Sequence, residues 1–261
     1  MIDTHCHILP GIDDGAADRR TAVQMARIAV EDGVTTVVAT PHVREGDWWN
    51  ERPEVLAAVE EFRGVLADEG IPLEIAPGAE VHLAPRLAER VKKGRLATYG
   101  DTGMWLLLEC PYRTRPIRLE ETVFELKLAG IQPVIAHPER TRWFLEDPSR
   151  WERIVELGAL GQMTSSSLLG TFGRAIRAVA EEWVRRGLVH VLGSDAHDPE
   201  YRPPRLAAAR DRWAELAGEE AARRATLDWP RAFLAGEAVE PPPPRPPEPP
   251  RRGFLARLFR R

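Results

Sequence analysis

The chain has 261 residues, 43% of them apolar, and a formal net charge of −4. This length and apolar content suffice for the core of one barrel-sized domain, and we expect no second one. Residues 240–261 hold six Arg and two Glu, or +4, which leaves −8 for residues 1–239. An acidic body excludes nucleic-acid binding through bulk charge.

Short apolar runs alternate with longer helical patterns as far as residue 193. The predicted strands cover residues 2–7, 34–40, 72–79, 104–109, 131–136, 159–163 and 188–193. The predicted helices cover residues 18–32, 53–69, 84–94, 119–129, 149–157 and 171–186, and a last helical region spans about 204–234. Seven strands followed by helices predict a single α/β domain with a parallel barrel rather than an open sheet. Five glycines stand where helices should end: Gly33, Gly70, Gly130, Gly158 and Gly187.

The composition changes at Pro241, because eight of the ten residues 241–250 are proline. Such a run favours extended polyproline II and predicts a semi-rigid linker over residues 237–252 that adds nothing to the core. At about 3.1 Å per residue, residues 241–250 would hold the end of the chain about 30 Å from the barrel. The domain is therefore expected to cover residues 1–236.

Residues 253–261 form a basic, amphipathic tail. As a short helix they would place four apolar side chains on one face and arginines on the other: Phe254, Leu255, Leu258 and Phe259. Such a segment suits an anionic lipid surface or a partner protein. A disordered basic tail is an equal alternative, because nine residues are marginal as an isolated helix.

Metal-ligating residue types recur directly after the predicted strands. His5 and His7 are two residues apart on the first strand, so their side chains point the same way. The carboxyl ends of parallel strands meet at one rim of a barrel, so ligands that are distant in sequence converge there. We expect nine ligands at this rim: His5, His7, Asp14, His42, Glu80, Glu109, His137, Asp195 and His197. His82, in a predicted loop, and His190, in a predicted core strand, are not expected to bind metal.

Nine nitrogen and oxygen ligands exceed the needs of one ion and suit about three divalent ions. Three such ions bring six positive charges and the four carboxylates remove four, so a surplus of about two remains to attract an anion. Phosphate suits this centre, because divalent ions hold its oxygens and activate water for in-line displacement. Cys6 and Cys110 each neighbour a proposed ligand, but strand alternation turns them away from the site, and reduced thiols are expected.

Five segments carry motifs around these residues: residues 1–16, Ala39–His42, Ala136–Arg140, Ser167–Gly173 and Ser194–His197. They resemble the PHP-domain metallophosphatases, and within them the bacterial tyrosine-protein phosphatases of the CpsB/YwqE type from capsule and exopolysaccharide gene clusters. The likeness runs from residue 1 to about residue 235. It implies a distorted (β/α)7 TIM-like barrel, the same nine ligands, and a trinuclear site supplied with Mn²⁺, with Fe or Zn as alternatives.

The resemblance also implies an activity and further site residues. The expected reaction is hydrolysis of phosphotyrosine on a cognate cytoplasmic tyrosine kinase that regulates polysaccharide synthesis. Arg140 and Arg202 would bind the phosphoryl group, because planar guanidinium groups make bidentate contacts with phosphate. Apart from the resemblance, the reaction itself suggests a proton donor to the leaving tyrosine oxygen: His42 or His197, if not fully committed to metal. One departure is visible near Thr164, where the family usually has an asparagine.

The sequence also predicts where in the cell the protein lies. The first strand starts at once and no apolar run approaches 18 residues, so we expect neither a signal peptide nor a membrane span. The expected location is the cytoplasm, with the basic tail holding the enzyme peripherally at the inner membrane face.

Three other functions fit parts of the pattern. Another PHP phosphoesterase, acting on histidinol phosphate or a nucleotide, would share every ligand. An amidohydrolase barrel also opens with His-x-His but commonly bridges its metals with a carboxylated lysine, and no lysine of this chain stands at a predicted strand end. A non-catalytic adaptor would keep the barrel and bind the kinase or membrane through its tail, but the complete ligand set argues against it.

Overall fold

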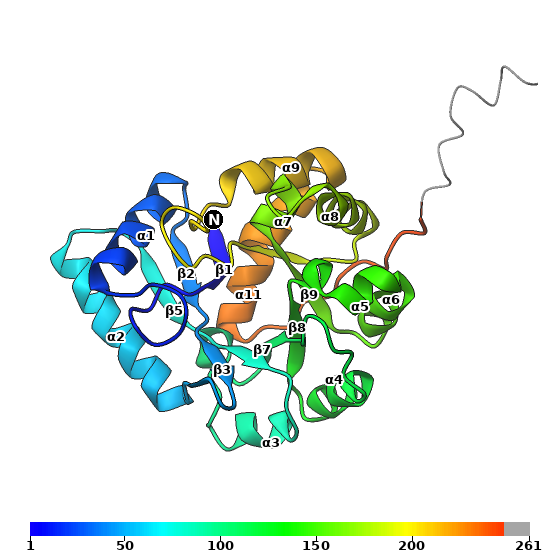
Figure 1. Cartoon of the computed structure of the whole chain (residues 1–261), viewed down its shortest axis with the longest axis horizontal. Helices are drawn as coiled ribbons and strands as arrows, with labels where there is room; N and C mark the ends of the chain where they lie inside the picture. The colour runs from blue at the N-terminus through cyan, green and yellow to red at the C-terminus, as the bar shows by residue number, and fades with distance from the viewer. Residues whose placement is uncertain (248–261) are drawn as a thin grey trace, which may run out of the picture.

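Parallel strands line the centre of the molecule, and helices surround them (Figure 1). The computed structural model describes residues 1–247. The strands are β1 (Ile2–Cys6), β2 (Thr36–Ala39), β3 (His42–Arg44), β4 (Trp48–Trp49), β5 (Glu74–Pro77), β6 (Glu80–His82), β7 (Trp105–Glu109), β8 (Gln132–Ala136), β9 (Leu160–Thr164) and β10 (Val191–Gly193).

Eleven α-helices and three shorter turns connect and follow these strands within residues 1–247. The helices are α1 (Arg19–Glu31), α2 (Arg52–Asp68), α3 (Leu87–Lys92), α4 (Leu119–Leu128), α5 (Arg142–Glu146), α6 (Pro148–Glu156), α7 (Ser165–Leu169), α8 (Arg174–Arg186), α9 (Ala207–Ala217), α10 (Glu219–Arg223) and α11 (Trp229–Ala235). Two 3-10 turns, η1 (Tyr99–Asp101) and η2 (Pro138–Arg140), and one π-helical turn, η3 (Arg224–Asp228), complete the set.

Two strands of the barrel wall are interrupted. β2 resumes as β3 and β5 resumes as β6; the first halves pair in the order β1-β2-β5 and the second halves join β10-β9-β8-β7-β6-β3-β4. A Cβ on Gly78 would lie 2.8 Å from Val38 Cγ1, so a side chain between β5 and β6 would press against the end of β2. Cys6 bridges to Ala196, which links β1 to the segment after β10 and closes the barrel. Counting each interrupted pair once gives seven parallel wall strands, and the predicted distorted (β/α)7 barrel is confirmed.

Apolar side chains fill two cores, one inside the barrel and one between the strands and the helices around them. The inner core includes Val38, Leu107 and Val191 and ends at α11. There the Phe233 ring stacks on Trp105 with their centroids 4.2 Å apart. The stacked rings of Phe233 and Trp105 close the end of the barrel where β7 begins. The opposite rim is left for polar residues.

Each predicted strand and helix has a counterpart, but several elements and two residues depart from the prediction. His190, expected inside a core strand, lies just before β10. The hairpin of β3 and β4, the short helices α5 and α7, and the split of the third strand into β5 and β6 were not predicted. His82 lies in β6 rather than in a loop. The five predicted C-cap glycines all have positive φ, between +63° and +87°. That prediction is confirmed.

The chain beyond α11 lies on the barrel. Trp105 Nε1 donates to Glu237 O at 2.9 Å. Arg245 N donates to Arg186 O at 2.7 Å, and Arg186 Nε donates to Arg245 O at 3.0 Å. The expected 30 Å spacer counted from residue 241 is therefore wrong, because the chain is still attached to α8 at residue 245. The predicted tail over residues 253–261 lies outside the described residues.

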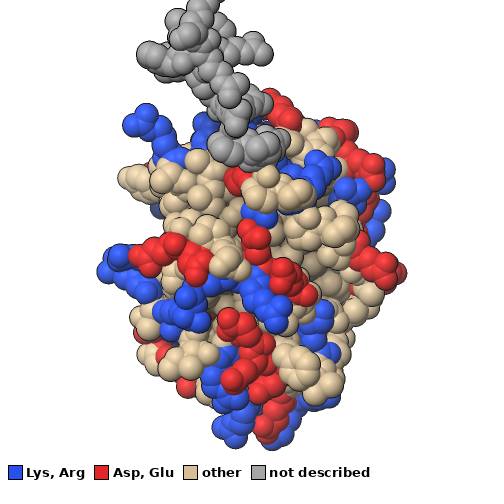
Figure 2. Space-filling view, turned by 90° about the vertical axis from the view of Figure 1, so that its right-hand side faces the viewer, with Lys and Arg blue, Asp and Glu red and all other residues tan. Residues whose placement is uncertain are grey.

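Charged side chains of both signs alternate over the face that contains α4, α6 and α8, rather than gathering by sign (Figure 2). Many are paired within a helix, as Arg118 is with Glu121. Arg153 and Glu156 form a second such pair, at 3.3 Å. Within residues 1–247, no helix combines the length and apolar character needed to cross a bilayer.

Candidate metal centre

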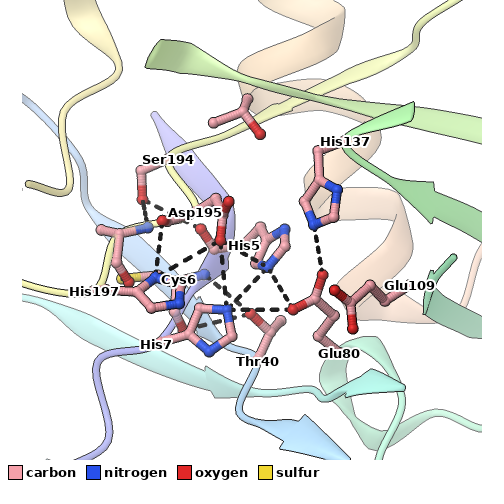
Figure 3. A network of polar contacts seen from close by, with 12 residues as sticks. His5, Cys6, His7, Thr40, Glu80, Glu109, His137, Ser194, Asp195 and His197 are labelled. Atoms are coloured by element: carbon pink, nitrogen blue, oxygen red, sulfur yellow. Dashed lines mark hydrogen bonds and ion pairs between the residues drawn. The ribbon is translucent and has the colours of Figure 1, made fainter. Parts of the chain in front are cut away.

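All nine predicted ligands meet at the rim formed by the carboxyl ends of the strands. Figure 3 labels seven of them, all except Asp14 and His42. His5 belongs to β1, His42 begins β3, Glu80 begins β6 and Glu109 ends β7, while His137 directly follows β8. Seven of the nine line a cavity of 200 Å³: Asp14, His42, Glu80, Glu109, His137, Asp195 and His197. His5 and His7 are buried and face the same cluster, as their spacing predicted.

Seven of these side chains form three groups in which the ligand atoms lie within 4.8 Å of one another. The groups are His5, His7 and Glu80; His42, Glu80 and Glu109; and His7, Asp14, His42 and His197. The other two are close by: His137 Nε2 lies 2.9 Å from Glu80 Oε1, and Asp195 Oδ1 lies 3.5 Å from His5 Nε2. Three overlapping groups that share ligands are the arrangement expected of a multinuclear centre.

The donor atoms themselves fit a set of divalent cations. Within the described residues, Oε2 of Glu109 is buried without a hydrogen-bond partner, and Oε2 of Glu80 lies 3.0 Å from His42 Nδ1 without the alignment of a hydrogen bond. A buried carboxylate oxygen without a partner costs free energy, so such atoms require an explanation. A divalent cation held by these carboxylates would supply it. Imidazole nitrogens with carboxylate oxygens suit Mn, Fe or Zn.

Two further residues orient the ligands and were not predicted. Asp13 Oδ2 accepts from His7 Nδ1 at 2.7 Å and from the backbone N–H of His42 at 3.0 Å. Gln162 Oε1 lies 2.8 Å from His5 Nδ1. Both contacts fix which ring nitrogen faces the cluster, as partners of metal-bound histidines do. The adjacent carboxylates Asp13-Asp14 were the one sequence signal that could have identified Asp13.

Two of the proposed ligands hold strained backbone conformations. His137 has φ +31° and Asp195 has φ +52°, in the left-handed region that non-glycine residues rarely adopt. Each stands just after a wall strand, β8 or β10. Asp195 N donates to His5 O at 2.7 Å, which holds this turn against β1. Strain of this kind clusters where a site fixes the direction of a side chain.

The site combines strongly perturbed acids and bases. Burial by itself would raise the pKa of Asp195, but the nearby His5, His7 and two arginines hold it well below its usual range. Burial and the charge of Glu80 raise the pKa of Glu109 to about 7. Burial opposes the charging of His7, yet Asp13 and the carboxylates of the cluster raise its pKa well above the ordinary value. Asp195 is therefore a negative carboxylate that faces imidazole and guanidinium groups on several sides.

Arg140 and Arg202 meet at Asp195. Arg202 Nη2 lies 2.6 Å from Asp195 Oδ2, and Arg140 Nη1 contacts the same oxygen. Both arginines line the 200 Å³ cavity. The guanidinium group of Arg140 also lies over two aromatic rings, 5.3 Å from the centroid of Tyr112 and 4.5 Å from that of Phe172. Two cations with planar donor geometry thus face the space above the metal ligands.

The remaining candidates lie away from this chemistry. Cys6 and Cys110 are free thiols in the buried apolar core, as expected. Among the described residues, neither His82 nor His190 belongs to the three groups. The backbone N–H of Thr164, where the sequence departs from the resemblance, donates to Glu139 Oε1 at 3.1 Å. The missing asparagine near Thr164 therefore affects no proposed metal ligand.

The fold and the rim together define an α/β barrel whose cavity is lined by candidate metal ligands and two arginines. This chain belongs to the family of capsular polysaccharide synthesis proteins CpsB/CapC, whose model matches residues 1–235. The resemblance inferred from the motifs is confirmed, and so is its extent.

Relatives with known names share most of this length. Tyrosine-protein phosphatase YwqE of Bacillus subtilis (strain 168) is 41% identical over 202 residues, which are 77% of this chain and 79% of YwqE. Tyrosine-protein phosphatase CpsB of Streptococcus pneumoniae is 27% identical over 244 residues, which are 92% of this chain and 100% of CpsB.

Solved structures agree with these matches. A structure from the crystallographic work on YwqE and CpsB, called unique metal-dependent tyrosine phosphatases, superposes with a TM-score of 0.90 at 36% identity. The match covers 95% of this chain and 100% of that one. Histidinol phosphate phosphatase of Lactococcus lactis has a TM-score of 0.53 at 14% identity, over 84% of this chain and 93% of its own. The second likeness shows a shared fold alone.

Proposed function

We propose that this protein is a metal-dependent protein-tyrosine phosphatase. The observation that carries the proposal is the convergence of nine metal-ligating side chains and two arginines around one 200 Å³ cavity. The names of the relatives support the same activity, since YwqE and CpsB are tyrosine-protein phosphatases.

About three divalent ions, with Mn²⁺ the proposed native metal, would be held by the nine side chains. Glu80 is the proposed bridging ligand, because it belongs to two of the three groups and also contacts His137. When bound, these ions neutralise phosphoryl oxygens and supply an activated water for attack on phosphorus. The overlap of the three groups supports this number.

The protein's own residues position the phosphoryl group. The planar guanidinium groups of Arg140 and Arg202 bind the equatorial oxygens of the phosphoryl group. Asp195 holds both guanidinium groups beside the metal ligands. The tyrosine leaves as a phenolate, whose conjugate acid has a pKa of about 10, so a strong general acid is not essential. His42 or His197 would supply a proton to this oxygen, since both line the cavity.

Aromatic side chains around the cavity suit the ring of a phosphotyrosine. The Trp48 ring stacks on His42 with centroids 5.1 Å apart, and the Tyr112 ring stacks on His137 at 5.2 Å. Both belong to the cavity wall, whereas Phe172 packs behind Arg140. Flat apolar walls beside the phosphoryl site favour an aromatic phosphate ester over an aliphatic one.

The proposed partner is the phosphorylated tyrosine kinase of a polysaccharide synthesis system, and the proposed location is the cytoplasm. The family supports this context through its role in capsular polysaccharide synthesis. We further propose that the basic tail over residues 253–261 holds the enzyme at an anionic membrane. The described chain supports this, because it leaves the barrel at Arg186, on the side opposite the metal ligands.

A comparison of substrates tests the proposed activity. Protein reconstituted with Mn²⁺ should hydrolyse a phosphotyrosine peptide with a kcat/KM at least about a hundredfold above those for a matched phosphoserine peptide and for histidinol phosphate. Faster hydrolysis of histidinol phosphate would assign the chain to another phosphoesterase activity of this fold. A reconstituted protein that hydrolyses none of the three would support the adaptor function instead.

A further inference from the structure

A second cavity lies where the chain enters α3 and α4, and we call it the α3–α4 pocket. Its volume is 340 Å³, more than ten times the roughly 30 Å³ that one water occupies in the liquid, so an apolar side chain fits it. Leu83, Ala84, Pro85 and Arg86 line it between β6 and α3, and Pro116 and Ile117 line it before α4. Within residues 1–247, no proposed metal ligand belongs to its lining.

The α3–α4 pocket is close to the metal centre. Leu83 N donates to Glu109 O at 2.9 Å, and Glu109 lines the 200 Å³ cavity. Tyr112 also lines that cavity, and Pro116 follows Tyr112 by four residues. Four residues span at most about 14 Å, so the walls of the two cavities come within that distance of each other. An extended peptide rises about 3.3 Å per residue and bridges the two in about four residues.

Apolar side chains are exposed around this rim of the barrel. Ile117, in the pocket wall, is 95% exposed. In the described part of the chain six large apolar side chains are exposed, and three others of these also belong to segments that follow strands at the metal rim: Trp49, Leu169 and Tyr201. Exposed apolar side chains that gather on one face mark an interaction site.

The loop between the two cavities carries positive charge that is free to pair. Arg113 and Arg115 are exposed and stand between Tyr112 and Pro116. Within residues 1–247, neither of them forms an ion pair, and Arg86 of the pocket wall forms none either. Glu125, the acidic residue of the pocket lining, already pairs with Arg118 at 3.4 Å. A peptide that crosses this loop is therefore favoured when it carries negative charge.

We propose that the α3–α4 pocket selects the sequence around the phosphotyrosine, an inference that rests on the proposed phosphatase activity. Its occupant is an apolar side chain of the substrate protein, about four residues from the phosphotyrosine. That side chain packs against Leu83, Pro116 and Ile117, while acidic residues between it and the phosphotyrosine face Arg113 and Arg115. The pocket thus sets the preference for acidic, apolar phosphotyrosine segments, and the metal centre performs the hydrolysis.

Phosphotyrosine peptides of defined sequence test this preference. Protein reconstituted with Mn²⁺ is assayed with one peptide that carries Glu-Glu-Gly-Leu directly after the phosphotyrosine and another that carries Leu-Gly-Glu-Glu directly before it. In matched peptides Ser replaces Leu. Each kcat/KM is divided by that of the same protein for free O-phospho-L-tyrosine, which is too short to reach the pocket. For at least one chain direction, the Leu peptide should exceed its Ser counterpart about tenfold.

Matched surface variants locate the preference. Ile117→Ser should remove the advantage of the Leu peptide, whereas Phe124→Ser, which removes an exposed apolar side chain of α4 outside the pocket, should keep it. The double variant Arg113→Gln, Arg115→Gln should lower the relative kcat/KM of the acidic peptides about fivefold at low salt. Arg153→Gln, on α6 and paired with Glu156, should leave it unchanged.

The assay separates this inference from the proposed function. Equal kcat/KM for the Leu and Ser peptides in both chain directions, with free phosphotyrosine still hydrolysed, would overturn the inference alone. An equal loss of preference in Ile117→Ser and Phe124→Ser would overturn it as well. No hydrolysis of any of the phosphotyrosine compounds would overturn the proposed function, and this inference with it.

Discussion

Glu80 and Asp195 show how single residues join the parts of the site. Glu80 Oε1 contacts His137 at 2.9 Å, while its Oε2 lies 3.0 Å from His42 and 3.3 Å from His5. Asp195 faces His5 and His7 with one oxygen and both arginines with the other. Glu80 thus connects separate ligand groups. Asp195 connects the ligands to Arg140 and Arg202, the two arginines proposed to bind phosphate.

Asp13 is expected to control metal affinity without binding metal itself. Asp13→Ala frees His7 to rotate, because it removes the acceptor at Nδ1. Loss of such a partner typically weakens metal binding about 10- to 100-fold. Metal titrations monitored by activity should show this weakening, while Asp18→Ala, which removes the N-cap of α1, should leave affinity unchanged. Unaltered affinity in Asp13→Ala would mean that His7 needs no orienting partner.

Arg202 is expected to act through its planar fork rather than through its charge alone. Arg202→Lys keeps the charge but loses bidentate contact, so kcat/KM for a phosphotyrosine peptide should fall by about 10- to 100-fold. Arg205→Lys is the matched control, since its guanidinium group is half exposed and pairs with Asp32. Equal kcat/KM for Arg202→Lys and the unmodified protein would remove Arg202 from the phosphate site.

Among the elements, the wall strands were predictable and their interruptions were not. Apolar runs, and the glycines that follow helices, located all seven wall strands. The breaks in β2 and β5 lie where these two segments approach each other closely at Gly78, and no local sequence pattern records that approach. Ligands at strand ends could be predicted because their type and position recur along the chain. Asp13 and Gln162 could not, because their roles depend on side chains distant in sequence, such as His5.

The pairing of β9 and β10 is expected to weaken in acid through His190. Its pKa is about 3 in the fold and about 6.5 when unfolded. Between these values the unfolded chain binds a proton that the folded chain does not, so stability falls as pH falls. The slope from this residue is at most about 1.4 kcal/mol per pH unit.

Urea unfolding of metal-free protein at several pH values between 6.5 and 4 measures this slope. His190→Gln is the control, because an amide oxygen can accept from Gly161 N–H without titrating. The variant should lose less stability in acid than the unmodified protein. Parallel losses in the two proteins would show that His190 does not contribute to acid sensitivity.

At the scale of the whole molecule, the metal-ligating residues and the last described segment lie at opposite ends of the barrel. The metal ligands follow the carboxyl ends of the strands, whereas Glu237 and Arg245 attach the last described segment where β7 begins and α8 ends. The described chain finishes beside α8 and α6 (Figure 1). A molecule held by its tail would therefore keep the 200 Å³ cavity directed away from the surface that holds it.

Removal of residues 248–261 is expected to separate membrane binding from catalysis. The six arginines of residues 240–261 include five in this segment, and each contributes about 1 kcal/mol near an anionic surface. Salt-sensitive binding to anionic vesicles should disappear, and hydrolysis of a small phosphotyrosine substrate should stay intact. Removal of residues 237–261 should also lower Tm, because Trp105 loses its acceptor on Glu237. Equal vesicle binding by the shorter protein would show that the segment is no anchor.

Metal content measured together with activity tests the central claim most directly. Elemental analysis of gently purified protein should find more than one and up to about three equivalents of Mn, Fe or Zn. Chelation should abolish phosphotyrosine hydrolysis, and added Mn²⁺ should restore it in the unmodified protein but not in Glu80→Ala. Full activity in metal-free protein, or an unmodified rate in Glu80→Ala, would contradict the account.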